Sequence, residues 1–430
     1  MVGLVPIRIV VAGGNYAGLS AVKALYSTLL APSADTSTDI ASLASLAGLE
    51  RPVEITLVDR RDGFVHFIGM TRGLTEPEYG AKLWTPYAEV AWLQHPSIKI
   101  HQASVTKITN THVHTQTTAD KTKVILPFDF LVICLGEGRF APIGTAATSK
   151  SQFVEQINKT FGEIQAARSV AVVGGGAVGI EMAADVKCDF PEKQVTLVHS
   201  RPLLLPGPFK DEFRGIVSDI LRKDIGVKLS LANRVIAQSP RSPDMNEGSD
   251  DPELVSSTAT GAKLTLSNGS HLSADYVIRC LGTRRKLAGL VDLADKSIFD
   301  KTGIRVKDTM QVDASGLDNI YACGDICSRD TVKLAGVAMY GGYIAGRNIA
   351  RCILYGSETQ LEMGQKYPSK IMLLMGKDHF AMQIADEIWD TERTRQFATP
   401  DMGLDSCVRA LALNCYPEYE PLEPIIPTEI

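Results

Sequence analysis

A glycine-rich stretch near the start of the chain has the residue spacing that binds the pyrophosphate of a dinucleotide. The sequence VVAGGNYAGLS at residues 10–20 places Gly13 and Gly18 at the first and third positions of the pattern G-x-G-x-x-G, with Asn15 at the second. Asparagine tolerates positive φ better than most residues other than glycine. We therefore expect Asn15 to hold the turn at positive φ, and an Asn15→Val variant to lose the nucleotide through strain.

The same spacing recurs about 160 residues later, without a substitution. The sequence VVGGGAVGIEM at 172–182 fills all three positions with Gly174, Gly176 and Gly179. Two such stretches in one chain indicate two dinucleotide sites, as in flavoproteins that bind FAD in one domain and NAD(P)H in a second. We expect FAD at the first stretch and NADPH or NADH at the second.

Each stretch has the flanking elements that such a turn requires. A short apolar run precedes it, which predicts a buried strand, and a segment with helical spacing follows. The next predicted strand ends in Asp59 in the first unit and in His199 in the second. Asp59 lies 41 residues after Gly18, about twice the ~20 expected. The excess at 31–52 is interpreted as an insertion formed by a helix end and a loop.

The residues at these two strand ends bear on the choice of nucleotide. An acidic residue such as Asp59 can accept hydrogen bonds from the ribose hydroxyls of an adenine nucleotide. His199 lacks the negative charge that would repel the 2′-phosphate of NADP, and Arg201 can pair with a phosphate. Arg201 could equally be a surface residue before a proline-rich loop, so NADPH and NADH both stay open.

A third segment, DNIYACGDI at 318–326, resembles a strand end that contacts a flavin. Asp325 follows Gly324 there, and a helical segment follows after a short loop. Asp325 could hydrogen-bond the ribityl chain, while the helix N-terminus stabilises negative charge on the reduced ring. The alternative is that Asp325 only caps the helix.

Three side chains are candidates for roles in catalysis. Glu181 follows the last glycine of the second turn and is predicted to lie near the nicotinamide, or else to be favoured there only by the helix dipole. Lys333 is placed near the flavin edge, or is simply solvated before the helix. His379 is a candidate proton donor to a reduced acceptor, because its pKa is near neutrality, although a loop-tip histidine is often merely exposed.

Patterns of other redox and hydrolytic centres are missing from the sequence. It contains no C-x2-C or C-x4-C pair to pass electrons to a thiol substrate, and we interpret Cys323 and Cys327 as a packed, reduced pair. It has no His/Cys cluster with the spacing of metal ligands, so no metal is predicted. Electrons must then leave the flavin directly for a bound acceptor.

Bulk properties favour an ordinary globular protein. The 430 residues are 45% hydrophobic and carry a formal net charge of −5, which argues against nucleic acid as a partner. Eight irregularly spaced cysteines suit a reducing compartment. The sequence shows no signal-peptide pattern and no apolar run of about 18 residues. We expect a cytoplasmic monomer or homodimer without a membrane span, and peripheral membrane contact stays open.

Several motifs resemble one family of flavoproteins. VAVVGGGAVGIEMAADVKCDFPEKQVTLVHS, RDGFVHFIGMTRG and IYACGDICSRDTVKLAG are similar to the apoptosis-inducing-factor-like, ferroptosis-suppressor (AMID-like) branch of NAD(P)H:quinone oxidoreductases. Type II NADH dehydrogenases are more distant relatives. The resemblance covers nearly the whole chain apart from 31–52 and 239–262, the second of which is a polar stretch predicted to be a hairpin loop.

The resemblance and the two turns together imply a set of nucleotide-binding residues. These are Gly13, Gly14, Asn15, Tyr16, Ala17, Gly18, Asp59, Arg60, Arg72, Lys82, Val105, Cys134, Gly136, Gly324 and Asp325 for FAD, and Gly174, Gly176, Ala177, Val178, Gly179, His199, Arg201 and Gly282 for NAD(P)H.

The implied architecture is an α/β fold with two Rossmann-like domains and a small C-terminal α+β domain. The FAD domain is expected at 1–150 and 284–360, the NAD(P)H domain at 151–283, and a C-terminal hairpin and helix at 361–430. The segment HFAM at 379–382 replaces small residues usual in the family's last hairpin, where the acceptor should bind.

The implied activity is transfer of hydride from NAD(P)H through FAD to a quinone-like or other conjugated small molecule. The altered hairpin leaves a second reading open, a flavoenzyme that tailors a dedicated secondary metabolite. A third reading is a slowly turning-over redox sensor of the apoptosis-inducing-factor type, which signals through a partner. Turnover with an added quinone would separate the two enzyme readings from the sensor.

Overall fold

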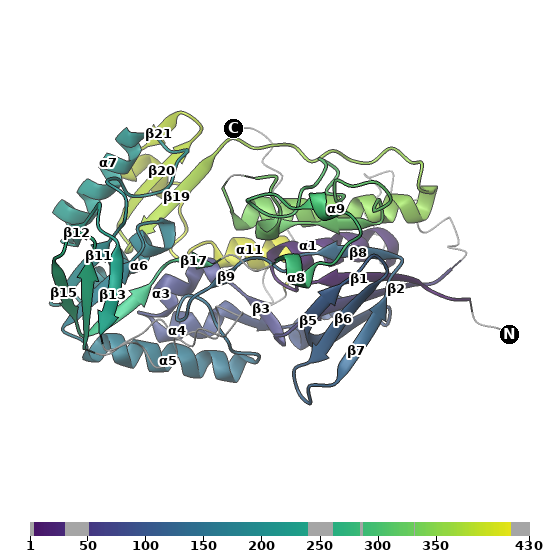
Figure 1. The fold of residues 1–430 in the computed structure, drawn as a ribbon, viewed down its shortest axis with the longest axis horizontal. Helices are drawn as coiled ribbons and strands as arrows, with labels where there is room; N and C mark the ends of the chain where they lie inside the picture. The colour runs from purple at the N-terminus through teal and green to yellow at the C-terminus, as the bar shows by residue number, and fades with distance from the viewer. Residues whose placement is uncertain (1–3, 31–50, 240–260, 284–286, 331, 414–430) are drawn as a thin grey trace.

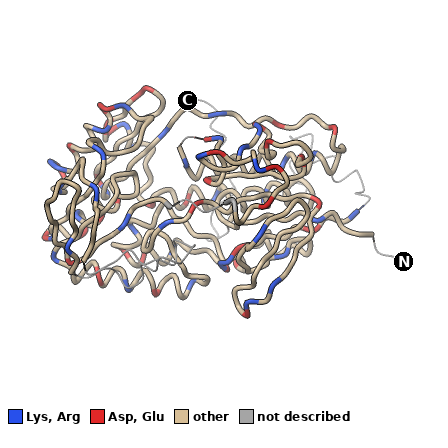
Figure 2. The backbone as a smooth tube through the Cα atoms, in the orientation of Figure 1, with Lys and Arg blue, Asp and Glu red and all other residues tan. Residues whose placement is uncertain are grey.

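The computed structural model describes residues 4–30, 51–239, 261–283, 287–330 and 332–413. The predicted insertion at 31–52 and the predicted loop at 239–262 lie almost entirely outside these residues. The fold is mixed α/β, as predicted, with a large sheet and a smaller parallel sheet at opposite ends of the molecule (Figure 1). Positive and negative side chains are interspersed along the described backbone (Figure 2).

The large sheet contains seven strands in the order β18-β8-β1-β2-β5-β6-β7. The strands from β18 to β5 are parallel, and β6 and β7 continue the sheet in antiparallel fashion. Their bounds are β1 (Ile7–Ala12), β2 (Val53–Asp59), β5 (Ile98–Ile108), β6 (His112–Thr117), β7 (Lys123–Pro127), β8 (Phe130–Ile133) and β18 (Ile320–Ala322). The apolar runs of β1, β2 and β8 are buried, which is typical of parallel strands covered on both faces.

The register of this sheet places the predicted site residues at one edge. Ala12 of β1 is paired with Val58 of β2 and with Ile133 of β8. The residues that come directly after Ala12, Val58 and Ile133 therefore lie side by side at the carboxyl ends of the strands. They include Gly13 and Asp59. Ligands of open parallel sheets bind at this edge.

The smaller sheet repeats the arrangement with four parallel strands in the order β12-β11-β10-β16. Their bounds are β10 (Ser169–Val173), β11 (Gln194–Val198), β12 (Lys228–Ser230) and β16 (Tyr276–Arg279). An antiparallel sheet of β13 (Val235–Ser239), β14 (Ala262–Leu266) and β15 (His271–Ala274) packs against it, with Val173, Leu264 and Val277 in one apolar cluster.

Helices cover the sheets and bring distant segments together. Helix α1 (Tyr16–Leu25) lies against the long helix α9 (Ala335–Tyr355) over the large sheet (Figure 1). A Cβ atom at Gly342 would lie 2.0 Å from the carbonyl oxygen of Ala17, so glycine is required for this contact. The smaller sheet carries α6 (Ala177–Asp189) and α7 (Asp211–Asp219), and α5 (Lys150–Ala166) precedes it.

The C-terminal part forms a third unit of hairpin and helices. It contains β19 (Lys370–Met375), β20 (His379–Ile384), β21 (Glu387–Trp389), α10 (Thr391–Arg395) and α11 (Leu404–Leu411). Helix α11 returns to α1, where Lys23 Nζ donates to the carbonyl oxygen of Ala410 at 2.8 Å. Short elements complete the described chain: β3 (Gly63–Val65), α3 (Met70–Gly73), α4 (Pro77–Gly80), β4 (Trp84–Pro86), β9 (Gly138–Arg139), β17 (Gly282–Thr283) and α8 (Leu287–Leu290). The predicted domain boundaries stay predictions.

Candidate functional site

A cavity of about 1220 Å³ joins the two predicted nucleotide turns. Gly13 and Asn15 of the first turn line it, as do Gly176 and Ala177 of the second. The hairpin strand β19 and the segment before α11 supply further walls. The volume exceeds the ~300–1,000 Å³ typical of a site for one small molecule. The cavity therefore has room for more than one ligand.

Both turns depend on glycine for the same geometric reason. Gly13 has φ +106°, and an added Cβ would lie 2.2 Å from the carbonyl oxygen of Cys134. Gly174 has φ +119°, and its Cβ would lie 2.5 Å from the carbonyl oxygen of Cys280. A Cβ at Gly18 would lie 1.7 Å from the Gly13 oxygen. Only glycine fits where each strand turns sharply into its helix.

The expected positive φ of Asn15 is wrong. Asn15 has φ −98° and ψ −153°, an extended conformation that any residue can adopt, and it precedes the first residue of α1. Its side chain reaches across the turn instead, where Oδ1 accepts a hydrogen bond from the Val65 backbone N–H at 3.1 Å. Gly176 has the equivalent conformation in the second turn, with φ −82° and ψ −179°. The second position of the pattern thus requires no left-handed backbone in either turn.

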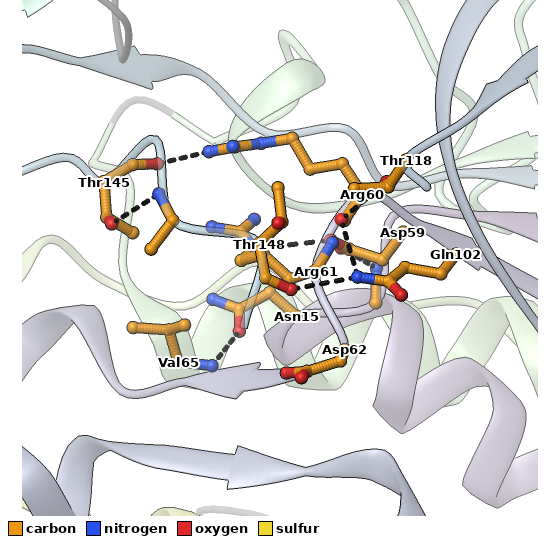
Figure 3. Close-up of polar contacts among 12 residues, drawn as sticks. Asn15, Asp59, Arg60, Arg61, Asp62, Val65, Gln102, Thr118, Thr145 and Thr148 are labelled. Atoms are coloured by element: carbon orange, nitrogen blue, oxygen red, sulfur yellow. Dashed lines mark hydrogen bonds and ion pairs between the residues drawn. The ribbon is translucent and has the colours of Figure 1, made fainter. Parts of the chain in front are cut away.

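Asp59 holds the first turn together from the end of β2 (Figure 3). One carboxylate oxygen accepts from the Gly14 backbone N–H at 2.7 Å, and the other accepts from the Arg61 backbone N–H at 2.8 Å. The side chain of the intervening Arg60 donates to the carbonyl oxygen of Ala146 at 3.0 Å. Asp59, Arg60 and Arg61 all line the cavity. Negative charge and arginine donors therefore meet where β2 ends.

His199 accepts a hydrogen bond from the backbone of the second turn, as Asp59 does in the first. Its Nδ1 accepts from the Gly175 backbone N–H at 3.1 Å. Burial, and then the charge of Arg201, lower the pKa of His199, so the ring is neutral at neutral pH. Arg201 itself is exposed just beyond the strand. The second turn therefore has no carboxylate at this position and has a guanidinium beside it.

Asp325 and Lys333 lie on the cavity wall formed by α9 and the loop before it. Asp325 is in the short 3₁₀ helix η9 (Gly324–Ile326) and pairs with Arg139, with Nη2 3.6 Å from its carboxylate. Lys333 Nζ donates to the carbonyl oxygen of Cys327. This bond turns the ammonium group toward the backbone of the loop.

Glu181 is a buried acid in the cavity wall. Its residue surface is 8% exposed, and Oε1 accepts from the Leu374 backbone N–H of β19 at 3.2 Å. Burial raises the pKa of Glu181 to about 8, against the opposing effects of the Leu374 hydrogen bond and of Arg72. At neutral pH the side chain is therefore a carboxylic acid, which can donate a hydrogen bond into the cavity.

The structure brings most of the predicted site residues together. Sixteen line the cavity: Gly13, Asn15, Tyr16, Ala17, Asp59, Arg60, Val105, Cys134, Gly136, Gly176, Ala177, Val178, Glu181, Gly324, Asp325 and Lys333. Others form the turns or flank them outside the lining: Gly14, Gly18, Gly174, Gly179, His199, Arg201 and Gly282.

Three predicted residues lie away from the cavity for identifiable reasons. Arg72 is 3% exposed, and its guanidinium donates to the carbonyl oxygens of Gly376 and Pro400 at 2.7 and 2.6 Å. Lys82 is exposed in the middle of the short 3₁₀ helix η3 (Ala81–Leu83). His379 begins β20 at the outer end of the hairpin, where it is paired with Met375. The hairpin lines the cavity through β19 and through Ile384, at the opposite end of β20 from His379.

A row of side chains fastens the C-terminal segment over the cavity. Arg72 donates to the carbonyl oxygen of Pro400, and Tyr79 Oη donates to that of Asp401 at 2.7 Å. The Nε2 atom of His66 lies 3.0 Å from the carbonyl oxygen of Met402. Three successive carbonyls are thus held by residues 66–79. Sequence reasoning missed this wall, although RDGFVHFIGMTRG contains two of the three side chains.

Comparison with known proteins identifies the family. Residues 7–342 match the model of the pyridine nucleotide-disulphide oxidoreductase family. The chain belongs to this family. Its members are two-domain dinucleotide-binding oxidoreductases, so the chain is an FAD-dependent NAD(P)H oxidoreductase. The predicted resemblance to ferroptosis-suppressor and apoptosis-inducing-factor-like flavoproteins is confirmed.

Individual relatives agree with this placement. Oxidoreductase OXR1 of Ajellomyces capsulatus is 30% identical over 431 residues, which cover 96% of this chain and 89% of the relative. Ferroptosis suppressor protein 1 of Homo sapiens is 27% identical over 349 residues, covering 80% and 86%. The water-forming NADH oxidase from Lactobacillus brevis bound to NADH has a TM-score of 0.61 at 17% identity, over 91% of this chain and 77% of that chain.

No helix within the described ranges is both long and apolar enough to cross a membrane. In the same part of the chain, no three His, Cys, Asp or Glu side chains gather in a way that could hold a metal ion.

Proposed function

We propose that this oxidoreductase passes a hydride from NADPH through FAD to a quinone-like or related conjugated small molecule. The cavity supports the proposal, because the first turn, which we assign to FAD, and the second, which we assign to NADPH, both line it. The hydride could then travel between two ligands bound in one enclosed space.

The residues of the first turn fit FAD. The N–H groups of Gly13 and Gly14 already donate to Val58 and Asp59, and the N-terminus of α1 offers its first backbone N–H groups to a pyrophosphate. Asn15 commits Oδ1 to Val65, which leaves its amide N–H₂ end to donate to a phosphate. A carboxylate has about four lone-pair directions, so Asp59 can still accept from a ribose. Asp325 would contact the ribityl chain. Bound FAD supplies the two-electron relay, and these residues supply position and electrostatics.

The nicotinamide side is assigned to the wall that contains Glu181. A protonated Glu181 can donate to a carboxamide oxygen while Leu374 holds its other oxygen in place. Gly176 leaves open space beside it, since no atom lies within 4 Å of a Cβ built there. The backbone of the second turn can therefore approach a pyrophosphate closely.

NADPH is favoured by the charges at the end of β11. His199 is neutral and holds the turn through Nδ1, so it does not repel a 2′-phosphate. Arg201 is exposed and carries a positive charge close to it. A carboxylate at position 199 would instead favour NADH.

Direct transfer to the acceptor, without a redox disulfide, is supported by the state of the thiols. The seven cysteines among the described residues are free. Cys323 and Cys327 are buried, and burial raises the pKa of both thiols well above the ordinary value. Thiolates are the reactive form, so these groups are poorly suited to accept and pass electrons.

The proposed roles of three residues change with their positions. Arg72 is now assigned to holding the segments at Gly376 and Pro400 in place rather than to a cofactor contact. His379 and Lys82 are assigned no contact with ligands. Lys333 keeps its place at the cavity wall.

An anaerobic titration followed by an acceptor tests the proposal. The purified yellow protein should lose its visible flavin absorbance on addition of NADPH and regain it on addition of naphthoquinone. Arg201→Ala should raise KM for NADPH about tenfold, the loss expected for one charged hydrogen bond, and leave KM for NADH unchanged. Bleaching without reoxidation by any quinone would favour the slow redox sensor instead.

A further inference from the structure

The hydrogen bonds of His66 fix which of its nitrogens carries the proton. His66 is completely buried behind the cavity wall, and burial lowers its pKa to about 4, so the ring is neutral. Nε2 lies 3.0 Å from the carbonyl oxygen of Met402. Because a carbonyl can only accept, Nε2 carries the hydrogen and Nδ1 has a lone pair.

The tautomer of His66 in turn fixes the hydroxyl of Tyr16. The Tyr16 oxygen lies 3.2 Å from Nδ1, so the phenolic hydrogen must point to the histidine. The ring of Tyr16 is held edge-on to Phe64, with 5.2 Å between centroids. The Ile68 backbone N–H approaches the oxygen at 3.4 Å, a long and weak contact. Tyr16 thus has no hydrogen to offer, but its oxygen can still accept a hydrogen bond.

Tyr16 lines the cavity beside both apolar and polar side chains. The polar ones include Asn15 and Arg61, whose guanidinium lies 5.2 Å from the centroid of the Phe67 ring. The apolar ones include Phe67, Ile68 and Met402. Ile68 is 40% exposed, which places it toward the rim of the cavity. The ring of Phe67, the thioether of Met402 and the aliphatic chain of Ile68 suit a flat conjugated ligand. The Tyr16 oxygen adds a directional polar contact.

Two further tyrosines line the same cavity from other parts of the chain. Tyr340 of α9 and Tyr367 before β19 both line the cavity, with ring centroids 5.3 Å apart at 73°. The hydroxyl oxygen of Tyr340 accepts from the Gln365 backbone N–H at 3.2 Å. Tyr340 is therefore a tyrosine of the same cavity whose hydroxyl is not fixed by a histidine.

We propose that the acceptor carries a hydroxyl group, which donates a hydrogen bond to the Tyr16 oxygen. The substrate class is a hydroxylated quinone or a related phenolic conjugated carbonyl compound, and Tyr16 is the residue that selects it. This assignment rests on the proposed reduction of an acceptor in this cavity. A ligand without a donor leaves the Tyr16 oxygen facing oxygen or carbon, and loses the contact.

Tyr16 is unsuited to the opposite role of proton donor. Burial raises the pKa of its phenol well above the ordinary value. Turning its hydrogen toward a ligand would also leave Nδ1 of buried His66 without a hydrogen-bond donor, which is unfavourable in a buried site. The proton taken up by a reduced carbonyl therefore comes from water or another group.

A pair of matched acceptors tests the assignment. The probes are a naphthoquinone with one ring hydroxyl and the methyl ether of the same molecule, which keeps the shape but cannot donate. The wild-type enzyme should show a KM for the hydroxy compound lower by about tenfold, as expected for one hydrogen bond. Tyr16→Phe should abolish that preference, and its FAD content and rate of flavin reduction by NADPH are measured alongside, so that an effect on the cofactor is told apart from an effect on the acceptor. Tyr340→Phe is the matched control and should change both KM values by the same factor.

Binding to the oxidised enzyme gives a second readout that does not need turnover. Perturbation of the flavin spectrum by each probe should give the same tenfold preference, lost in Tyr16→Phe. Absence of the preference in the wild type, or its survival in Tyr16→Phe, would overturn the assignment. The assignment also fails if Tyr16→Phe binds both probes more weakly by the same factor and retains less FAD. In that case the hydrogen bond to the Tyr16 oxygen would come from the flavin and not from the acceptor. If both probes bind but neither reoxidises the reduced flavin, the proposed function fails instead.

Discussion

The two glycine turns have the same backbone geometry but differ in the side chain that secures them. In the first, the Gly14 N–H donates to Asp59 at 2.7 Å, and in the second the Gly175 N–H donates to Nδ1 of His199 at 3.1 Å. A carboxylate and a neutral imidazole thus perform the same structural task. The residue at the strand end can therefore change its charge without loss of the turn.

The turns also differ in how they use the space next to the ligand. Asn15 fills the second position of the first turn and ties it to Val65, whereas Gly176 leaves that space open. Two residues after the last glycine, Ser20 lines the cavity in the first unit and buried Glu181 lines it in the second. The first turn is braced by its own side chains, and the second is open beside an acid.

The largest effect is expected when a glycine that the turn requires, Gly13, is replaced, compared with a glycine that its turn does not require, Gly176. Gly13→Ala places a Cβ 2.2 Å from the Cys134 oxygen at φ +106°. Strain and overpacking of this kind cost about 2–6 kcal/mol together, so the variant should lose FAD and melt at a lower temperature. Gly176→Ala is the control, because its Cβ would meet no atom within 4 Å. FAD content and Tm of both variants are the measurements. Equal behaviour of the two would contradict the account of the turns.

The buried acid of the second unit should make stability depend on pH. The pKa of Glu181 is raised from 4.5 to about 8 by burial, so between these values the unfolded chain releases a proton that the folded protein keeps. Stability contributed at this site is therefore lost as pH rises through that window. Glu181→Gln cannot ionise and should be more stable at about pH 8 by on the order of 3 kcal/mol, with little change at about pH 4.5. Urea denaturation at the two pH values checks this. If the free energies of unfolding of the two proteins change equally between these pH values, Glu181 is solvated in the folded protein, which would contradict this account of its burial.

The charge at the end of β11 should set the nucleotide preference. His199→Asp keeps an acceptor for the Gly175 N–H but adds a negative charge. The ratio of kcat/KM for NADPH to that for NADH should fall about tenfold or more, since one charge contact is worth about 1.5–3 kcal/mol. His199→Asn, a neutral acceptor, should keep the ratio near the wild-type value. An unchanged ratio in the aspartate variant would remove position 199 from the 2′-phosphate site.

The smallest effect concerns Asn15. Its φ of −98° removes the expectation that a β-branched residue would strain the turn. Asn15→Val should therefore retain FAD, with an affinity lower by about tenfold from the lost contact to Val65. Asn15→Gly should show a similar loss. Dissociation constants measured by flavin fluorescence decide this, and complete loss of FAD in the valine variant alone would restore the strain explanation.

The sequence was sufficient to predict the local parts of this architecture. The strand, glycine turn and helix around Gly13 and Gly174 are encoded within a few residues, and the positions of Asp59 and His199 follow from the next strand. The family and the α/β fold were predicted correctly on this basis. The conformation of Asn15 was not, because the Val65 N–H that binds its side chain comes from strand β3, 50 residues further along the chain.

Contacts between distant segments were beyond sequence reasoning. The bond from His66 to Met402 spans 336 residues, and nothing in the spacing of either residue predicts it. Arg72 is part of a conspicuous motif, but only the fold shows that its guanidinium faces backbone carbonyls. His379 looked available for the acceptor, yet the residue of β20 that lines the cavity is Ile384, at the other end of the strand. Such roles depend on which face of an element is turned toward its neighbours.

The central claim, that two turns serve one path for electrons, is tested most directly by anaerobic single turnover. Protein with FAD bound and its accessible thiols alkylated is mixed with NADPH, and then with a hydroxylated naphthoquinone. The account predicts that the flavin absorbance disappears in the first step and returns in the second, with alkylation making no difference. A flavin that stays oxidised with NADPH and with NADH, or reoxidation that is lost on alkylation, would contradict it.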